Sequence, residues 1–278
     1  MWPALFLSHG SPMIALEPGA AGLFMHRLGP AIDRIWGRPR GIVVMSPHTA
    51  TPATYVLGGA HHDTIHDFGG FPAELYELHY DAPGAPDLAR DVAERLTRAD
   101  VPATWTPHGG LDHGIWTVLM HLYPQCDIPV VPVSLTPHRS PTEMLAMGRA
   151  LRDLRADGVL VIGSGSLTHN LRRFFQRPTP VDAPEEPDCA EFRAWVDART
   201  QACDWSALLD YRARAPHAVA MHPTDEHWLP FYFAAGAGCD DAQGQPHTAL
   251  RLHASVTHGH LAMDAYGFGQ DAAKLLNV

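Results

Sequence analysis

The sequence ALFLSHGSP, residues 4–12, places an apolar run directly before a histidine and a turn made of glycine, serine and proline. The run is typical of a buried strand, and Gly and Pro are the residues that most often mark turns. A turn alone does not need His9. We therefore ask whether other strands of the chain end in the same way.

Two further apolar runs lead to a histidine. GIVVMSPHT, residues 41–49, reaches His48, and VLVIGSGSLTHN, residues 159–170, reaches His169 after a glycine–serine turn. In an open α/β sheet the carboxyl ends of parallel strands share one edge, where ligand sites are built. Three histidines delivered there would converge, as a metal site with nitrogen ligands requires. The alternative for each histidine is a hydrogen bond to nearby backbone, and both interpretations stay open at this point.

Short apolar runs alternate with helical patterns along the chain, which is typical of an α/β domain. We expect a single domain over residues 1–278, with a central, mostly parallel or mixed β-sheet flanked by helices. The expected strands are residues 4–7, 41–45, 54–57, 102–106, 130–135, 159–162 and one or two strands after Ala249. The expected helices are residues 21–36, 86–99, 113–123, 141–156, 189–202 and 227–235. Ser140, Pro141 and Glu143 form a capping-box pattern at the start of the fourth helix.

The composition argues against several classes of protein. The 278 residues are 46% hydrophobic, enough for a full core, and the net charge of −10 without a basic run disfavours nucleic acid or an anionic membrane as partner. The four cysteines form no C-x-x-C pair, and the sole lysine, Lys274, disfavours a P-loop or a Schiff-base enzyme. No apolar stretch is long enough to span a bilayer and no leader pattern is present, so we expect a cytoplasmic protein.

The glycine–serine turn at residues 163–166 lacks the marks of two common enzyme motifs. Thr168 stands where G-x-G-x-x-G needs its third glycine, and no G-x-S-x-G nucleophile elbow occurs there. The 19 histidines are the unusual feature of the composition, because imidazole is the commonest protein metal ligand and the usual acid or base at neutral pH.

Two more clusters combine acids with histidine at expected helix starts. GGLDHGIW contains Asp112 and His113, and HPTDEHWLP contains Asp225, Glu226 and His227. Helix N-termini favour anions, so a site between them would attract an anionic substrate or oxygen species. Helix capping is the alternative role for Asp112 and for Asp225 with its neighbour Thr224. Periodicity does not separate the roles of Glu226 and His227.

Seven sequence blocks, taken in order, resemble the class III extradiol ring-cleavage dioxygenases, and most of all their DOPA-dioxygenase-like branch. The blocks are HGSP (9–12), SPH (46–48), HDFGGFPAELY (66–76), GLDHGIW (110–116), IPVVPVSL (128–135), GSGSLTHNLR (163–172) and HPTDEHWLP (222–230). The resemblance runs from residue 3 to about residue 230, with a looser C-terminal region. It is specific for the superfamily and much less so for the substrate.

This resemblance implies an α/β fold with a mixed sheet and one non-haem iron(II) centre, which in some relatives holds zinc(II). It implies His9, His48 and His227 as metal ligands. His169 matches a histidine beside the metal, either a catalytic base or a fourth ligand, and His113 matches a histidine near oxygen and substrate. Related protocatechuate-type enzymes use two histidines and a carboxylate. Glu226 is therefore an alternative third ligand, whereas a ligand His227 makes the site richer in nitrogen and suited to zinc.

The expected reaction joins O2 to a small aromatic diol of the catechol type, such as a DOPA-like dihydroxyphenyl compound, and opens the ring beside the diol to a semialdehyde. In this interpretation His169 takes a proton from the diol, and His113 stabilises the oxygen-derived anion. Asp67, Phe68 and Tyr76 are candidates for the substrate side, with core packing as the alternative for Phe68.

Two other classes of function stay open. A zinc hydrolase would use the same ligands with a metal-activated water, and a non-catalytic homologue would bind metal without turnover. Retention of all four metal-site histidines and of His113 speaks against the non-catalytic homologue. The sequence carries no signal for an oligomeric state.

Overall fold

Eight strands form one mixed sheet in the order β4-β3-β5-β2-β6-β1-β10-β7, and β8 and β9 form a separate pair. The computed structural model describes residues 1–239 and 249–278. The strands are β1 (Ala4–Ser8), β2 (Gly41–Ala50), β3 (Thr54–Leu57), β4 (Ala103–Thr106), β5 (Val130–Leu135), β6 (Val159–Gly165), β7 (Ala249–His253), β8 (Val256–Thr257), β9 (Leu261–Ala262) and β10 (Ala265–Phe268).

The four central strands β5, β2, β6 and β1 are parallel to one another. Antiparallel pairs flank them, with β3 beside β5 on one side and β10 beside β1 on the other. Parallel strands bring their carboxyl ends to the same edge of a sheet. The ends of β1, β2 and β6 therefore lie together, which confirms the expected α/β class with a mixed sheet.

The helices and 3-10 turns connect these strands. The helices are α1 (Gly19–Trp36), α2 (Ala73–Tyr76), α3 (Pro86–Arg98), α4 (His113–Leu122), α5 (Pro141–Arg149), α6 (Leu171–Gln176), α7 (Pro187–Gln201), α8 (Trp205–Leu209), α9 (Tyr211–Arg214), α10 (Ala218–Met221) and α11 (Leu229–Ala237). The 3-10 turns are η1 (Pro12–Ala15), η2 (Arg152–Asp157) and η3 (Gln270–Leu275). Within the described residues, no helix is both long and apolar enough to cross a membrane.

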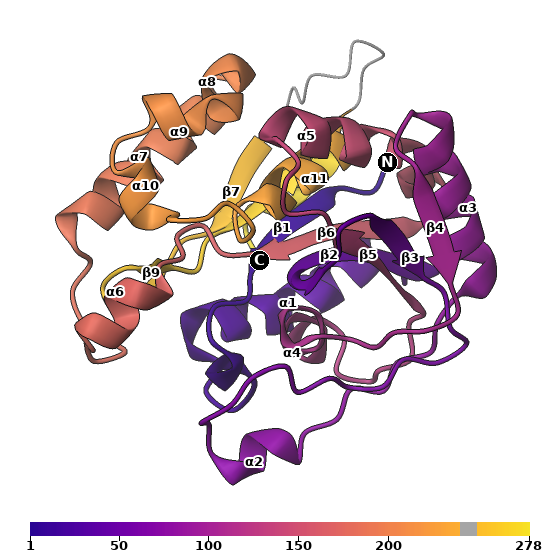
Figure 1. Cartoon of the computed structure of the whole chain (residues 1–278), viewed down its shortest axis with the longest axis horizontal. Coiled ribbons are helices and arrows are strands. Elements are labelled where there is room, and N and C mark those ends of the chain that lie inside the picture. The colour runs from indigo at the N-terminus through magenta and orange to yellow at the C-terminus, as the bar shows by residue number, and fades with distance from the viewer. Residues whose placement is uncertain (240–248) are drawn as a thin grey trace.

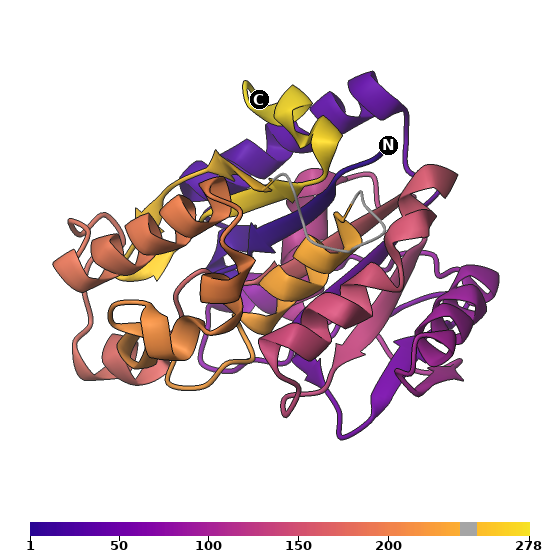
Figure 2. The ribbon, with the colours of Figure 1, turned by 90° about the horizontal axis from the view of Figure 1, so that it is seen from above.

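Both faces of the sheet are covered, as the uninterrupted apolar strands require. On β2, Val43 and Met45 enter the core beneath α5 and α11, while Ile42 and Val44 enter the core beneath α1 and α4. Figure 1 shows these two helix pairs on opposite sides of the sheet. In Figure 2 the orange α11 and the pink α5 lie side by side on one face of the sheet, and α11 passes over the central strands.

The structure corrects several expected boundaries. The expected helix 141–156 is divided, because the chain tightens into η2, where Leu154 is buried and Arg155 donates to the carbonyl of Trp2 at 2.7 Å. The capping box at its start is confirmed, with Ser140 accepting from the Glu143 amide. The expected helix 227–235 begins two residues later, and the expected strand 41–45 continues as far as residue 50. The expected helices also omit α2, α6, α8, α9 and α10, which are short.

The glycines of the GSGS turn serve close packing. A methyl group on Gly163 would overlap the carbonyl oxygen of Pro230, and one on Gly165 would overlap that of His227. Glycine at both positions lets the start of α11 rest on β6 without a side chain between them. This contact places the segment around His227 at the carboxyl end of the sheet.

We expect Gly163→Ala to lower the free energy of unfolding by about 1–3 kcal/mol, because the added methyl meets backbone that cannot move without displacing α11. Thermal or urea unfolding measures the change. Gly69→Ala is the matched control, since a methyl there has no atom within 4 Å. Equal stability of the two variants would contradict the packing role of Gly163.

Candidate metal centre

His9 continues the line of β1 and is fully buried. Its backbone amide donates to the carbonyl of Gly165 at 2.9 Å, which extends the pairing of β1 with β6 by one residue. Its Nδ1 lies 3.0 Å from the hydroxyl of Ser164, and that hydroxyl donates its only proton to the carbonyl of Gly114. The hydroxyl must therefore accept from His9, so Nδ1 carries the proton and the lone pair of Nε2 is free.

His48 lies within β2, two residues before its end. The pairing of β2 with β5 shifts register between Ser46 and Ala50, which leaves His48 in an irregular segment. Such bulges re-aim side chains at the ends of strands. Asp112 holds both flanks of the irregularity, accepting from the hydroxyl of Ser46 at 2.7 Å and from that of Thr49 at 2.5 Å. A buried carboxylate therefore fixes the direction of His48.

His227 lies in the turn before α11 and is almost fully buried. Its carbonyl accepts from the amide of Ser166 at 3.0 Å, which ties the turn to the end of β6. Its Nδ1 donates to Oε1 of Glu226 at 3.3 Å, and the same oxygen accepts from the hydroxyl of Thr224 at 3.0 Å. A carboxylate only accepts, so His227 too has its proton on Nδ1 and a free lone pair on Nε2.

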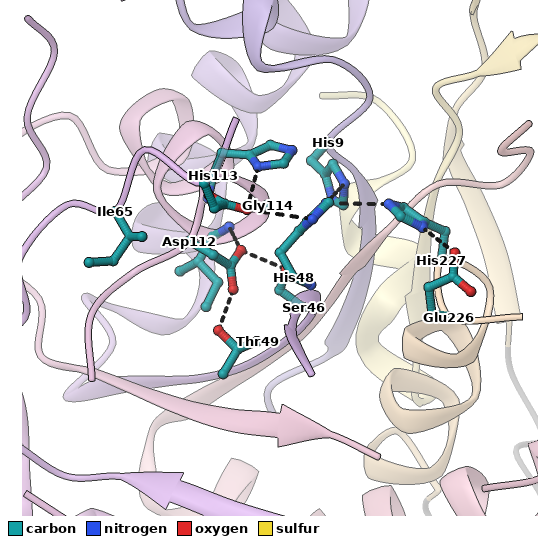
Figure 3. Close-up of polar contacts among 12 residues, drawn as sticks. His9, Ser46, His48, Thr49, Ile65, Asp112, His113, Gly114, Glu226 and His227 are labelled. Carbon is teal, nitrogen blue, oxygen red and sulfur yellow. Dashed lines mark hydrogen bonds and ion pairs between the residues drawn. The ribbon is translucent and has the colours of Figure 1, made fainter. Parts of the chain in front are cut away.

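These three imidazoles converge on one point. Nε2 of His48 lies 3.2 Å from Nε2 of His9 and 3.3 Å from Nε2 of His227, and the three ring centroids are 5.0–5.4 Å apart. Figure 3 shows the side chains of His9 and His48 close together, with His227 pointing toward them. The chain thus brings together residues from the ends of β1 and β2, which lie on either side of β6 in the sheet, and one from a turn about 180 residues after His48.

The proton positions show that this cluster fits a cation. Since His9 and His227 offer only lone pairs at Nε2, a proton on His48 could satisfy one of the two contacts at a time. The remaining contact sets two lone pairs face to face. A zinc–nitrogen bond of about 2.0–2.1 Å places the nitrogens of a tetrahedral site about 3.3 Å apart, which is the separation found here. The donor set therefore suits a divalent first-row ion.

The histidines are neutral, as metal ligands must be. Burial, followed by the neighbouring histidines, holds the pKa of His9 and that of His227 well below the usual value. Burial also lowers the pKa of His48 to about 3, with His113 adding to the effect and Asp67 opposing it. At neutral pH each of these rings therefore offers a lone pair.

His113 opens α4 beside the cluster and is oriented by Asp67. One oxygen of Asp67 accepts from the His113 amide at 2.8 Å, and the other accepts from its Nδ1 at 2.9 Å. The second oxygen also lies 3.5 Å from Nδ1 of His48. Although burial acts to raise the pKa of Asp67, the hydrogen bonds from His113 outweigh it and lower that pKa. Asp67 is thus an anion that orients His113 and faces His48.

His169 follows β6 by four residues and stacks on His227. The two ring centroids are 3.4 Å apart and the planes differ by 8°. Burial lowers the pKa of His169 to about 4, with Glu226 opposing the shift. Ligand atoms of His169, Glu226 and His227 lie within 4.8 Å of one another, as do those of His9, His48 and His113, and the contact of His48 with His227 joins the two groups.

The structure assigns some roles that the sequence left open. Asp112 caps α4 through the Ile115 amide and also accepts from Ser46 and Thr49. Asp225 is not a side-chain cap of α11, because it accepts from the hydroxyl of Tyr211 at 2.6 Å and pairs with Arg212.

The structure also gives the contacts of three residues near the cluster, Ser164, Asp67 and Phe68. Ser164 orients His9, and the only sequence signal for it is its place in the GSGS turn. Asp67, a candidate for the substrate side, hydrogen-bonds to His113 and lies 3.5 Å from Nδ1 of His48. For Phe68 the expected roles are the substrate side or core packing, and its half-buried side chain is compatible with both. Its ring lies 5.6 Å from that of His113 and 5.2 Å from that of Tyr76.

Comparisons with known proteins agree with this geometry. Residues 3–269 match the family described as the catalytic LigB subunit of aromatic ring-opening dioxygenase. A Beta vulgaris protein named 4,5-DOPA dioxygenase extradiol is 34% identical over 268 residues, covering 95% of both chains. An Escherichia coli K12 protein of the same name is 38% identical over 239 residues, 84% of each chain.

A solved structure of an uncharacterized protein from Escherichia coli K12 has the same fold. Its TM-score is 0.75 at 31% identity, and the match covers 97% of this chain and 100% of that one. The family match alone covers residues 3–269, which include every histidine described above. The chain belongs to the LigB family of aromatic ring-opening dioxygenases, and it is a metal-dependent, extradiol ring-cleaving oxidoreductase.

Proposed function

We propose that His9, His48 and His227 hold one divalent metal ion. The observation that carries this proposal is the convergence of their Nε2 atoms at 3.2 and 3.3 Å, with the Nδ1 protons of His9 and His227 already donated elsewhere. Glu226 acts on this site through His227. Its Oε1 already accepts from Nδ1 of that ring and from Thr224, which supports the histidine as the third ligand.

His169 is the base in this proposal. The ring of His169 is stacked on that of His227, with centroids 3.4 Å apart and planes 8° apart, so its nitrogens do not point toward Nε2 of His227. This orientation favours a role beside the three ligands over a fourth place among them. A neutral imidazole next to a bound diol can accept its proton, and the stacked His227 limits movement of the ring.

The proposed substrate is a catechol-type diol of the DOPA-like, dihydroxyphenyl class, with O2 as the second substrate. Relatives at 34% and 38% identity are named 4,5-DOPA dioxygenase extradiol, which supports this class. Aromatic rings lie on one side of the centre, where Phe68 contacts His113 and Tyr76 contacts Phe68. Such rings stack on an aromatic substrate at little cost in entropy.

The expected metal is iron(II) in the active enzyme, with zinc(II) able to occupy the same nitrogen donors. When bound, iron(II) supplies a Lewis acid for the diol and an electron donor for O2. The chain's own contribution is to orient the substrate and to move protons. His169 removes a proton from a hydroxyl of the diol. His113, with Asp67 at its Nδ1 to stabilise positive charge, donates toward the anion that develops on oxygen.

Each of the single variants His9→Ala, His48→Ala and His227→Ala should lose most of the bound metal, because two imidazoles hold a divalent ion far more weakly than three. Metal analysis of the purified variants measures this. Glu226→Gln is the control, and we expect it to keep one equivalent of metal while weakening its affinity about 10- to 100-fold. Three alanine variants with full metal would rule out the ligand assignment, and loss of metal only in the Glu226 variant would move the third ligand to that residue.

The purified protein should contain zinc or little iron and should cleave catechols only after anaerobic loading with iron(II). The nitrogen-rich site and the order of divalent affinities both favour zinc when the metals compete. Oxygen uptake on a panel of catechols, together with the absorbance of the semialdehyde product, measures turnover. Activity that is highest with zinc and independent of O2, on an ester or amide, would indicate a hydrolase instead.

His169→Ala should keep its metal and still bind substrate, while kcat falls roughly 10²- to 10⁴-fold, the range typical of general acid–base catalysis. Raising the pH should partly restore the rate, because solution then removes the proton from the diol. Steady-state kinetics across pH with parallel metal analysis tests both points. Near-complete loss of metal would make His169 a fourth ligand, and turnover within a few-fold of the parent would remove it from both roles.

A further inference from the structure

A second buried histidine, His222, lies close to the site but outside the proposed ligand set. Its side chain is fully buried, and its ring packs against Trp228 and Phe192 at centroid distances of 5.7 Å. Nε2 of His222 donates to the carbonyl of Leu167 at 2.8 Å. Among the described residues its Nδ1 has no hydrogen-bond partner. The ring thus makes one polar contact, and that contact is with backbone.

The carbonyl that His222 holds belongs to the segment that carries His169. This segment, residues 166–169, leaves the end of β6 without regular secondary structure, so its shape depends on bonds from its surroundings. The amide of Leu167 donates to the hydroxyl of Ser8 at 3.2 Å, and the amide of His169 donates to the carbonyl of Met221 at 2.8 Å. Met221 immediately precedes His222. Two consecutive residues therefore bind the segment on both sides of Thr168.

An apolar residue in the place of His222 would be buried at a smaller cost in desolvation free energy. A buried imidazole with an unpaired nitrogen loses hydration that it does not fully regain, at a cost on the order of 1–3 kcal/mol. Trp228 and Phe192 offer surroundings in which leucine or phenylalanine would pack without that loss. What only a donor provides is the bond to Leu167, whose carbonyl would otherwise be buried without a partner.

The same residue also precedes the proposed ligand His227 by five positions and stacks on Trp228 with planes 30° apart. His222 therefore bridges the segment of His169 and the segment of His227, whose rings stack at 3.4 Å. A stack of two imidazoles has no directional bond of its own. Its geometry is set by the backbone on each side.

We propose that His222 is a positioning residue for His169, fixing the 166–169 segment through the Nε2–H bond to Leu167 so that the His169 ring stays stacked on His227. This inference rests on the role of His169 proposed above. His222 itself contacts no substrate in this proposal and binds no metal.

Two substitutions separate the hydrogen bond from the packing. His222→Gln places an amide nitrogen at the reach of Nε2 and can still donate to Leu167. His222→Leu removes the donor. If His222→Leu does not accumulate as folded protein, His222→Asn replaces it, because its shorter amide reaches only the position of Nδ1.

His62 offers a matched control elsewhere in the fold. It is also fully buried, its Nε2 donates to the carbonyl of Val130 at 3.0 Å, and its Nδ1 has no partner among the described residues. Val130 pairs with Ile42 at the amino end of β2, six residues before His48 and so roughly 20 Å from it. His62→Leu therefore removes an equivalent bond far from the site.

We expect His222→Leu to lower kcat on the order of 10- to 100-fold, as small displacements of catalytic groups do, with KM and metal content close to those of the parent. His222→Gln should recover kcat to within about threefold of the parent. His62→Leu should lower the melting temperature to a similar degree and leave kcat unchanged. In the metal-free protein, amide hydrogen exchange over residues 166–170 should accelerate in His222→Leu and not in His62→Leu.

A double variant completes the test. With His169→Ala in place, His222→Leu should lower kcat no further, because the group that it positions is gone. Full additivity of the two effects, unchanged kcat in His222→Leu, or loss of metal in that variant would each overturn the proposal. Parent-like turnover of His169→Ala alone would instead refute the proposed base, and unaltered exchange over residues 166–170 would refute the positioning bond independently of activity.

Discussion

The constraint on which the site depends is that the Nε2 atoms of three imidazoles meet, and that His9 and His227 offer only lone pairs there. This is unfavourable unless a cation lies between them, so the fold must hold the rings together without help from hydrogen bonds at Nε2. It does so by placing a polar partner at Nδ1 of each ring. Ser164 accepts from His9 and Glu226 accepts from His227, while Asp67 faces His48. The hydrogen bonds to Ser164 and Glu226 select, for His9 and His227, the tautomer that a metal ligand needs.

The backbone around the cluster departs from regular geometry where the rings must be aimed. The register shift in β2 turns His48 toward its neighbours, and Asp112 stabilises that shift through two hydroxyls. On β6, Gly163 and Gly165 let the start of α11 approach the strand, which sets the depth of His227. A register shift and glycine residues both weaken a regular strand. Here both occur at the edge of the sheet where the parallel strands end.

The two histidines beside the cluster, His113 and His169, depend more on hydrogen bonds than on regular secondary structure for their positions. His113 owes its position to the start of α4 and to Asp67, whereas His169 stands on an irregular segment held by side-chain and backbone bonds. Proton transfer depends steeply on distance and direction. A base carried on an irregular segment therefore requires the dense set of hydrogen bonds that surrounds residues 166–169.

The sequence by itself determined the α/β class, most strand positions and the histidines offered at strand ends, because apolar periodicity and turn residues are local signals. The metal-ligand roles remain predictions. Only the tertiary structure decided that His48 lies in a bulge, that the GSGS glycines admit α11, that Asp67 orients His113 and that Ser164 orients His9. Each of these depends on atoms from segments distant in sequence. For His9 and His113, the ring nitrogen that keeps its proton is set by such a distant partner, which leaves no mark on the local pattern.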